Sequence, residues 1–288
     1  GCHRRVFRWL NAIVKQRHRP IIAAGAVATL HITCTHRTLC DDTPEYMPPP
    51  AKLDDPEENA KVLERWRKHI EEARHMFRSL DIVGAERELQ LALEDAAHFG
   101  SSSAPMATSL VNLAQLYRRA GRLDEAEPLL ERAADLLDQT AGPNNKVTIL
   151  ALVDLANTQA ERGNIEAAAV NFEDILERIN QAEENQVTGR TAIRAVLASV
   201  LLQAAKVDTR RGSFGTAESR LRRSVELAEE RWGANSQRLL APLIELALVM
   251  HAMRRSAEAL EVCDRAEGLA ENLAQQQSVA KVRQRISA

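Results

Sequence analysis

From residue 57 onward the chain alternates apolar and polar positions with the period of an α-helix. In residues 108–137, TSLVNLAQLYRRAGRLDEAEPLLERAADLL, apolar residues recur at i, i+3, i+4 and i+7 on both sides of Gly121. This predicts two amphipathic helices that fold back on each other, because a glycine between them lets the chain turn. Ala114 and Ala126 are small where two such helices must approach within about 8–10 Å. One hairpin leaves an apolar face uncovered, so the pattern requires similar neighbours.

The pattern is indeed repeated at a nearly constant spacing. Gly163 lies 42 residues after Gly121, and Gly212 follows after 49 more, which places an insertion of seven residues near 180–190. A further step of 42 reaches Arg254 and a step of 41 upstream reaches Leu80, so the two outer repeats lack the glycine. The predicted repeats lie near 66–99, 107–140, 149–182, 198–232 and 240–273, followed by a C-terminal cap at 278–288.

Leu113, Ala114, Tyr117, Gly121 and Ala126 resemble the pattern of the tetratricopeptide repeat, which places Leu, Gly or Ala, Tyr, Gly and Ala at these offsets. The segment AGPN at 141–144 and the extra length are similar to the roughly 42-residue repeats of kinesin light chains. The resemblance implies an all-α fold, an α-solenoid that forms a right-handed superhelix of about five helix-turn-helix repeats over residues 57–288. Aromatic residues make up only 3% of the chain, which suits helices packed through alanine.

The N-terminal part differs in composition. Residues 1–40 contain seven Lys or Arg residues and no Asp or Glu, and in residues 1–19 the basic and apolar residues fall on opposite helix faces. This resembles a mitochondrial targeting segment, with a secretory or anchor segment and a disordered basic tail as the alternatives. The apolar stretch at 21–35 is short for a bilayer span and is a candidate for membrane association or anchoring. Residues 41–56, with five prolines and five acidic residues, predict an extended linker.

No motif for catalysis, a cofactor or a metal is found in the sequence. It has no phosphate-binding glycine loop and no H-E-x-x-H segment, so we expect no catalytic residue and no enzyme activity. His31, Cys34, His36 and Cys40 lie close together, but their spacing fits no paired zinc scheme. Cys263 occupies a core position of the last repeat. The repeat region is acidic overall, which argues against a nucleic-acid partner.

The resemblance implies that the first helix of each repeat lines a concave groove that binds a protein segment. Side chains away from the packing positions would then meet the partner. According to the repeat pattern, the first-helix residues that face the groove are Asn112, Gln115, Arg118, Arg119, Asp154, Asn157, Glu161, Gln203, Lys206, Arg210, Glu245 and His251. Amides with scattered bases suit a peptide of partly acidic character. We predict Asn112, Gln115, Arg118, Arg119, Asn157, Gln203, Lys206 and Arg210 as the partner-binding residues.

The order of segments, and residues 191–211 and 224–236 in particular, are similar to a family of mitochondrial tetratricopeptide-repeat proteins associated with assembly and upkeep of respiratory complex III. This predicts a non-catalytic scaffold or assembly factor in mitochondria, with the inner membrane as one option. A kinesin-light-chain-like cargo adaptor in the cytoplasm and a bacterial envelope scaffold are the alternatives. The basic N-terminal segment argues against the cytoplasmic adaptor.

Overall fold

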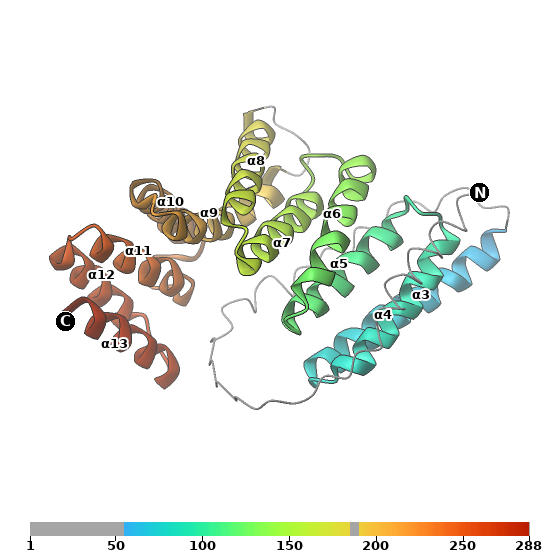
Figure 1. Cartoon of the computed structure of the whole chain (residues 1–288), viewed down its shortest axis with the longest axis horizontal. Helices are drawn as coiled ribbons and strands as arrows, with labels where there is room; N and C mark the ends of the chain where they lie inside the picture. Colours follow the sequence, from blue (N-terminus) through green and yellow to red (C-terminus); the bar gives the residue numbers. More distant parts are fainter. Residues whose placement is uncertain (1–54, 185–189, 288) are drawn as a thin grey trace. The chain divides into compact units, whose positions relative to one another are not determined.

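The computed structural model describes residues 55–184 and 190–287, and every regular element in these two ranges is helical. This confirms the predicted all-α solenoid. Eleven α-helices and one short 3-10 helix occur in the described residues (Figure 1). They are α3 (Pro56–Arg78), α4 (Ile82–His98), α5 (Ala104–Arg119), α6 (Leu123–Thr140), α7 (Lys146–Arg162), α8 (Ile165–Glu184), α9 (Arg190–Arg211), α10 (Phe214–Trp232), η1 (Gln237–Leu239), α11 (Leu240–Ala252), α12 (Ser256–Gly268) and α13 (Leu273–Ser287).

The helices pack as antiparallel pairs, each stacked on the next. The pairs are α3 with α4, α5 with α6, α7 with α8, α9 with α10, and α11 with α12. The first helices also contact one another in series, from α3 to α5, α7, α9 and α11, and α13 continues this series after α11 (Figure 1). Contact between successive first helices creates one continuous row, which we call the first-helix row.

The two helices of a pair meet at a turn that has the same backbone conformation in all five pairs. Gly121, Gly163 and Gly212 have positive φ, as do Leu80 (65°) and Arg254 (66°) at the aligned positions. The residue after each of them donates its N–H to a carbonyl five residues earlier, as from Arg122 to Tyr117 at 2.8 Å. This hydrogen bond is the Schellman closure of a helix end, which needs one left-handed residue. The repeat pattern therefore fixes the backbone even where the glycine is absent.

Alanine lets the helices of each pair and of neighbouring pairs approach closely. Each second helix has an alanine five residues after its turn residue, and all five of these alanines are completely buried. They are Ala85, Ala126, Ala168, Ala217 and Ala259. Larger side chains such as Leu130, Phe172 and Leu221 fill the remaining space four residues further on. Small and large residues thus alternate between facing positions, as close packing requires.

The predicted insertion falls where α8 ends and α9 begins, and these two helices are 20 and 22 residues long. Ile179 and Ala182 near the end of α8 are fully buried, so the last two turns of this helix take part in the core. At the C-terminal end α13 packs on α12 and α11 through Val279 and Ile286. None of the described helices is both long enough and apolar enough to cross a bilayer. The apolar stretch at 21–35 and the predicted targeting segment lie outside the described residues.

Candidate protein interface on the first-helix row

The predicted binding residues all lie on α5, α7 and α9, and the related Glu245 and His251 lie on α11. Their side chains avoid the packing faces of these helices and are at least partly exposed. We call this exposed side of the row the first-helix face. It spans four helix pairs, because the steps of 42 and 49 residues bring equivalent positions of successive helices next to one another.

Side chains of α5 and α7 are joined across this face by Asp154. Gln115 donates from Nε2 to Oδ2 of Asp154 at 2.7 Å, and Arg118 Nη1 lies 3.4 Å from Oδ1. Arg118 and Asp154 are only 15% and 18% exposed, so this ion pair is shielded from solvent on most sides. Two of the predicted residues therefore hold α5 against α7.

Arg210 and Glu161 connect α7 to α9. Arg210 donates from Nη1 to the Ala160 carbonyl oxygen at 2.6 Å. Solvent reaches Glu161, yet surrounding protein atoms partly desolvate its carboxyl group and so raise its pKa, while Arg118 and Arg210 act in the opposite direction. Glu161 thus lies in the field of two arginines from the neighbouring first helices.

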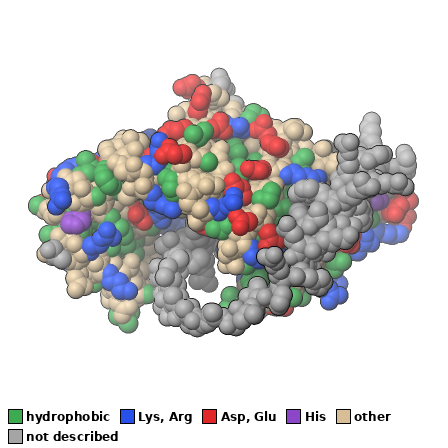
Figure 2. Space-filling model, viewed as in Figure 1, with side chains coloured by type: hydrophobic (Ala, Val, Ile, Leu, Met, Phe, Trp, Pro, Cys, Tyr) green, Lys and Arg blue, Asp and Glu red, His purple; other side chains and the backbone are tan. Residues whose placement is uncertain are grey.

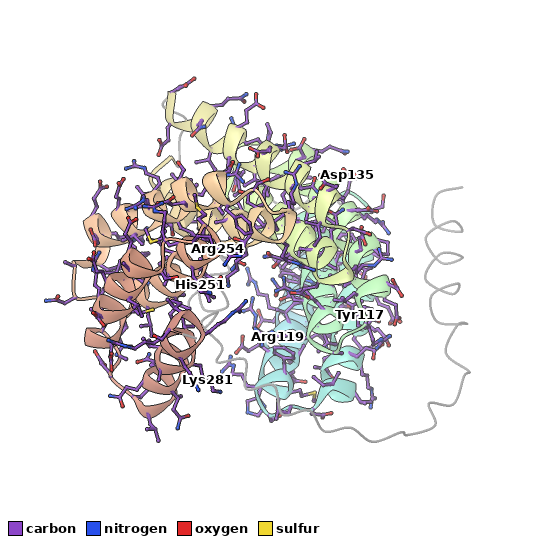
Figure 3. The ribbon with its side chains drawn as sticks, turned by 60° about the vertical axis from the view of Figure 1, so that its left-hand side comes forward. Tyr117, Arg119, Asp135, His251, Arg254 and Lys281 are labelled. Carbon is purple, nitrogen blue, oxygen red and sulfur yellow. The ribbon has the colours of Figure 1, made fainter. Side chains whose placement is uncertain are left out.

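Lys206 and Glu245 form the corresponding connection between α9 and α11. Lys206 Nζ lies 3.5 Å from Glu245 Oε1, and the two side chains are about one-third exposed. At the other end of the row, Arg119 of α5, labelled in Figure 3, has its guanidinium carbon 4.5 Å from the centroid of the Phe77 ring of α3. Every neighbouring pair of first helices from α3 to α11 is therefore linked by a side chain of this face.

The amide side chains differ in their surroundings. Asn112 donates from Nδ2 to the Thr108 carbonyl within its own helix at 2.9 Å. Gln203 is partly buried on α9. Asn157, partly exposed in the middle of α7, has no hydrogen-bond partner among residues 55–184 and 196–287. It is also the residue equivalent to Gln115 on α5 and Lys206 on α9.

A second set of charged contacts, at the turns, was not anticipated from the sequence. An arginine next to each of the four later turns reaches a glutamate on the second helix of the preceding pair. These contacts are Arg122–Glu86, Arg162–Glu127, Arg211–Glu166 and Arg255–Glu218. Tyr117 adds a hydrogen bond from its hydroxyl to Glu86 at 2.9 Å, and its burial and the nearby carboxylate raise the pKa of Tyr117. The signal in the sequence is that Glu86, Glu127 and Glu218 recur six residues after the turn position.

The described part of the chain contains no group of three His, Cys, Asp or Glu residues placed to hold a metal ion. Cys263 is buried in the core of the last pair, and this burial raises the pKa of its thiol. The protonated thiol behaves there as a small apolar side chain.

Comparisons with known proteins agree with this architecture. The family model described as tetratricopeptide repeat matches residues 105–181. The putative kinesin light chain repeats of Podosopora anserina superpose with a TM-score of 0.59 at 20% identity, covering 71% of this chain and 94% of that one.

Two Rap proteins share the fold over part of their length. RapI in its apo form superposes with a TM-score of 0.61 at 13% identity, and a Rap protein complexed with competence and sporulation factor does so with 0.58 at 16%. These matches cover 77% and 76% of this chain but only 58% and 57% of the Rap chains. No curated protein sequence matches the chain. At these identities the structural likeness concerns the fold alone.

Proposed function

We propose, from the premise that the chain is a tetratricopeptide-repeat protein, that it is a non-catalytic scaffold which binds a segment of another protein along its first-helix face. The observation that carries this proposal is the continuity of that face. Side chains link α3, α5, α7, α9 and α11 in series, so an extended segment could contact several pairs at once. Binding spread over several rigid elements loses less entropy than binding to mobile loops.

The finer proposal is that the scaffold works in mitochondria, in the assembly or upkeep of a respiratory complex such as complex III. Its support is the basic, acid-free composition of residues 1–40 and the two-faced pattern of residues 1–19. A basic amphipathic segment suits import, because the potential across the inner membrane draws positive charge inward. A kinesin-light-chain-like cargo adaptor and a bacterial envelope scaffold are the alternatives, and the experiment below distinguishes the first of them from the mitochondrial proposal.

The test uses a photo-crosslinking amino acid in the full chain. One variant carries it in place of Asn157, in the middle of the first-helix face. A matched control carries it in place of Asp135, which is exposed on the second helix α6 (Figure 3). After irradiation in mitochondrial extract, we expect a specific adduct from the Asn157 position and none from the Asp135 position.

Mass spectrometry of the adduct then identifies the partner. A complex III subunit supports the finer proposal, whereas a kinesin heavy chain supports the cargo adaptor. Adducts that form equally at both positions, or only at Asp135, would remove the first-helix face from the function.

A further inference from the structure

Two arginines beside the loop between α10 and α11 differ from the other arginines nearby. On α10, Arg222 pairs with Glu218 and Arg223 pairs with a glutamate one turn further along the helix. Arg231 and Arg238 are exposed, and among the described residues neither guanidinium has a carboxylate or any other hydrogen-bond acceptor. Their positive charges are therefore available to a ligand.

Both of these arginines lie against the same indole ring. Trp232 is the last residue of α10, and the guanidinium carbon of Arg231 is 5.1 Å from the centroid of its ring. The guanidinium carbon of Arg238 is 4.6 Å from the same ring. Residues six or seven apart in sequence are thus brought together, and the two cations lie beside one tryptophan.

The backbone on both sides of this loop is held by the core. Trp232 is partly buried and packs against the apolar cluster of α10 and α11. Gly233 turns the chain with φ at 86°, and Leu239, the neighbour of Arg238, is completely buried. Both arginines are therefore attached to fixed backbone positions, although their guanidinium groups are exposed.

The repeat fold does not require this arrangement. Gly142 and Gly233 each lie 21 residues after the turn glycine of their own pair, so the loops that contain them are equivalent. In the earlier loop, the positions of Arg231, Trp232 and Arg238 are occupied by Thr140, Ala141 and Val147. Because the same connection forms there without arginine or tryptophan, these three residues are free to serve another purpose.

The hydrogen-bond donors of this cluster match a phosphate group. Contact with an aromatic ring leaves the N–H groups of a guanidinium without an oxygen acceptor. The indole N–H of Trp232 has no acceptor among the described residues either. A phosphate monoester carries nearly two negative charges near neutral pH, and its oxygens accept paired hydrogen bonds from arginine. Two guanidinium groups at one ring therefore balance the charge of one such group.

A larger anionic surface fits this site less well. Glu226 and Glu229 lie on the last turns of α10, where they would repel a long acidic segment or a negatively charged bilayer. Basic and acidic side chains are also interspersed over the face of the described helices seen in Figure 2, so that face offers no extended surface of one charge. The charge at Trp232 is local, and so is the anion that it suits.

The exposure of the two arginines indicates how the phosphate is carried. Small free ligands are normally bound in clefts that bury most of their surface. A phosphate bound to Arg231 and Arg238 would stay open to solvent, because both side chains are exposed. A phosphate attached to a protein needs no enclosure, since the protein around it adds further contacts.

We infer that Arg231 and Arg238, gathered at Trp232, bind a phosphorylated serine or threonine side chain of a partner protein. This is a second site, and it does not depend on binding at the first-helix face. Recruitment of that partner then follows its phosphorylation, because the unmodified hydroxyl group offers the two cations no charge.

Fluorine NMR of the full chain labelled with 5-fluorotryptophan tests this, with the Trp232 resonance assigned from a Trp232→Phe variant. The probe is a short capped peptide of alanine and glycine with one central phosphoserine. We expect this peptide to shift the Trp232 resonance and its unphosphorylated form to leave it unchanged. Affinity should decrease as NaCl increases. It should also be lower at pH 5.5 than at pH 7.5, because phosphoserine loses its second proton with a pKa of about 6.

Substitutions then locate the contact. Arg231→Gln and Arg238→Gln should each weaken binding at least about tenfold, a loss of about 1.4 kcal/mol. Arg223→Gln is the matched control, since it removes an arginine of the same helix that already has a carboxylate, and binding should stay within about twofold. Lysine at positions 231 and 238 should restore only part of the affinity, because an ammonium group lacks the paired donors of guanidinium. Circular dichroism should show the same helical content in all of these variants.

The other outcomes would overturn the inference. Inorganic phosphate that binds as tightly as the peptide would assign the site to a free phosphate compound. Sedimentation of the chain with vesicles of phosphatidic acid, lost in the double glutamine variant and without any response to the peptide, would assign it to a membrane. A resonance that does not respond to the peptide, or a response that survives in the double variant, would show that the arginines bind no phosphate. None of these results affects the crosslinking test at Asn157, which concerns the first-helix face alone.

Discussion

Leu80 and Gly121 occupy the same turn position in neighbouring helix pairs, and both have positive φ, 65° and 74°. The left-handed conformation costs a residue with a Cβ atom about 1–2 kcal/mol relative to its usual conformation. The Leu80 side chain is 82% exposed and so gains almost nothing from packing. The first pair therefore carries a strained residue where the second carries a relaxed one.

We expect Leu80→Gly to stabilise the protein by up to about 1 kcal/mol. Glycine removes the left-handed strain, and the larger entropy of glycine in the unfolded chain offsets about 0.4–1 kcal/mol of that gain. Urea unfolding followed by circular dichroism measures the difference. Leu80→Ala is the control, because it deletes the exposed side chain and keeps the strained Cβ, and it should give no gain.

The reverse substitution serves as a second control. A Cβ placed on Gly121 meets no atom within 4 Å, so Gly121→Ala changes the conformational energy without a clash. It should destabilise the protein by about 1 kcal/mol. Equal stability of Gly121→Ala and the parent would show that the left-handed turn is not a source of strain at either position.

Ala168→Leu should destabilise the protein by about 1–3 kcal/mol, because its site at the helix crossing is completely filled. Its neighbour Ala167 is exposed on the same helix, so Ala167→Leu is a matched control with the same change in helix propensity. Thermal melts of the two variants give the comparison. A melt of Ala168→Leu no lower than that of Ala167→Leu would contradict the assigned crossing.

Arg220→Met should be strongly destabilising near neutral pH. Arg220 donates to Asp208 at 2.6 Å, and Asp208 is 2% exposed, so the substitution leaves a buried carboxylate without its cation. Loss of one partner from a buried pair costs about 3–5 kcal/mol. Asp208→Asn combined with Arg220→Met should recover much of this loss, which separates the charge effect from lost packing.

The stability of the Arg220→Met variant should fall as pH increases. Burial already raises the pKa of Asp208, and Arg220 opposes that shift. Without Arg220 the pKa rises further, so the folded state binds a proton that the unfolded state releases. Stability is then greatest below the ordinary aspartate pKa and falls as pH increases through the raised one. Urea unfolding of Arg220→Met should show a smaller deficit at acidic pH than at pH 7, and a deficit independent of pH would refute the mechanism.

Replacing Arg4, Arg5 and Arg8 by Glu should abolish import of the full-length chain into isolated mitochondria. The substitutions reverse the charge of the basic face in residues 1–19, on which attraction to the inner-membrane potential depends. Protease protection of the radiolabelled chain measures import, with replacement of the same residues by Lys as the control. Import that survives the reversal would favour a secreted or envelope location.

The fold could be predicted because few residue types determine it. Alanines at helix crossings repeat at a nearly constant step, as do glycines at three of the five turns. Each helix is buried by contact with its nearest neighbours alone. Leu80 and Arg254 depart from the glycine pattern, yet the buried Ala85 and Ala259 after them keep the same turn. At Leu80 and Arg254, packing of the second helix therefore determines the left-handed turn conformation, which the intrinsic preference of these residues does not favour.

The arrangement of side chains on the first-helix face could be predicted only in part. Helical period places Gln115, Lys206 and Arg210 on the exposed side of their helices. Their acceptors, Asp154, Glu245 and the Ala160 carbonyl, lie about 40 to 50 residues away in sequence on another helix. Whether such side chains meet depends on the exact rotation of each helix about its axis. The period of the apolar residues shows which side of a helix is buried, but it does not fix this rotation closely enough. The sequence thus located the residues but did not reveal that they bind one another.

Within residues 55–184 and 190–287, the helices that pack extensively on one another are at most two α-helices apart along the chain. Packing among these helices therefore does not require distant parts of the polypeptide to find each other first, so structure can start within the array and spread in both directions. On a ribosome, a pair could fold as soon as the neighbouring pair that covers its apolar face has emerged, without waiting for the chain to be finished. Because contacts are confined to neighbouring pairs, the scaffold can also be lengthened easily. Inserting one more pair changes the contacts of only the two pairs that flank it.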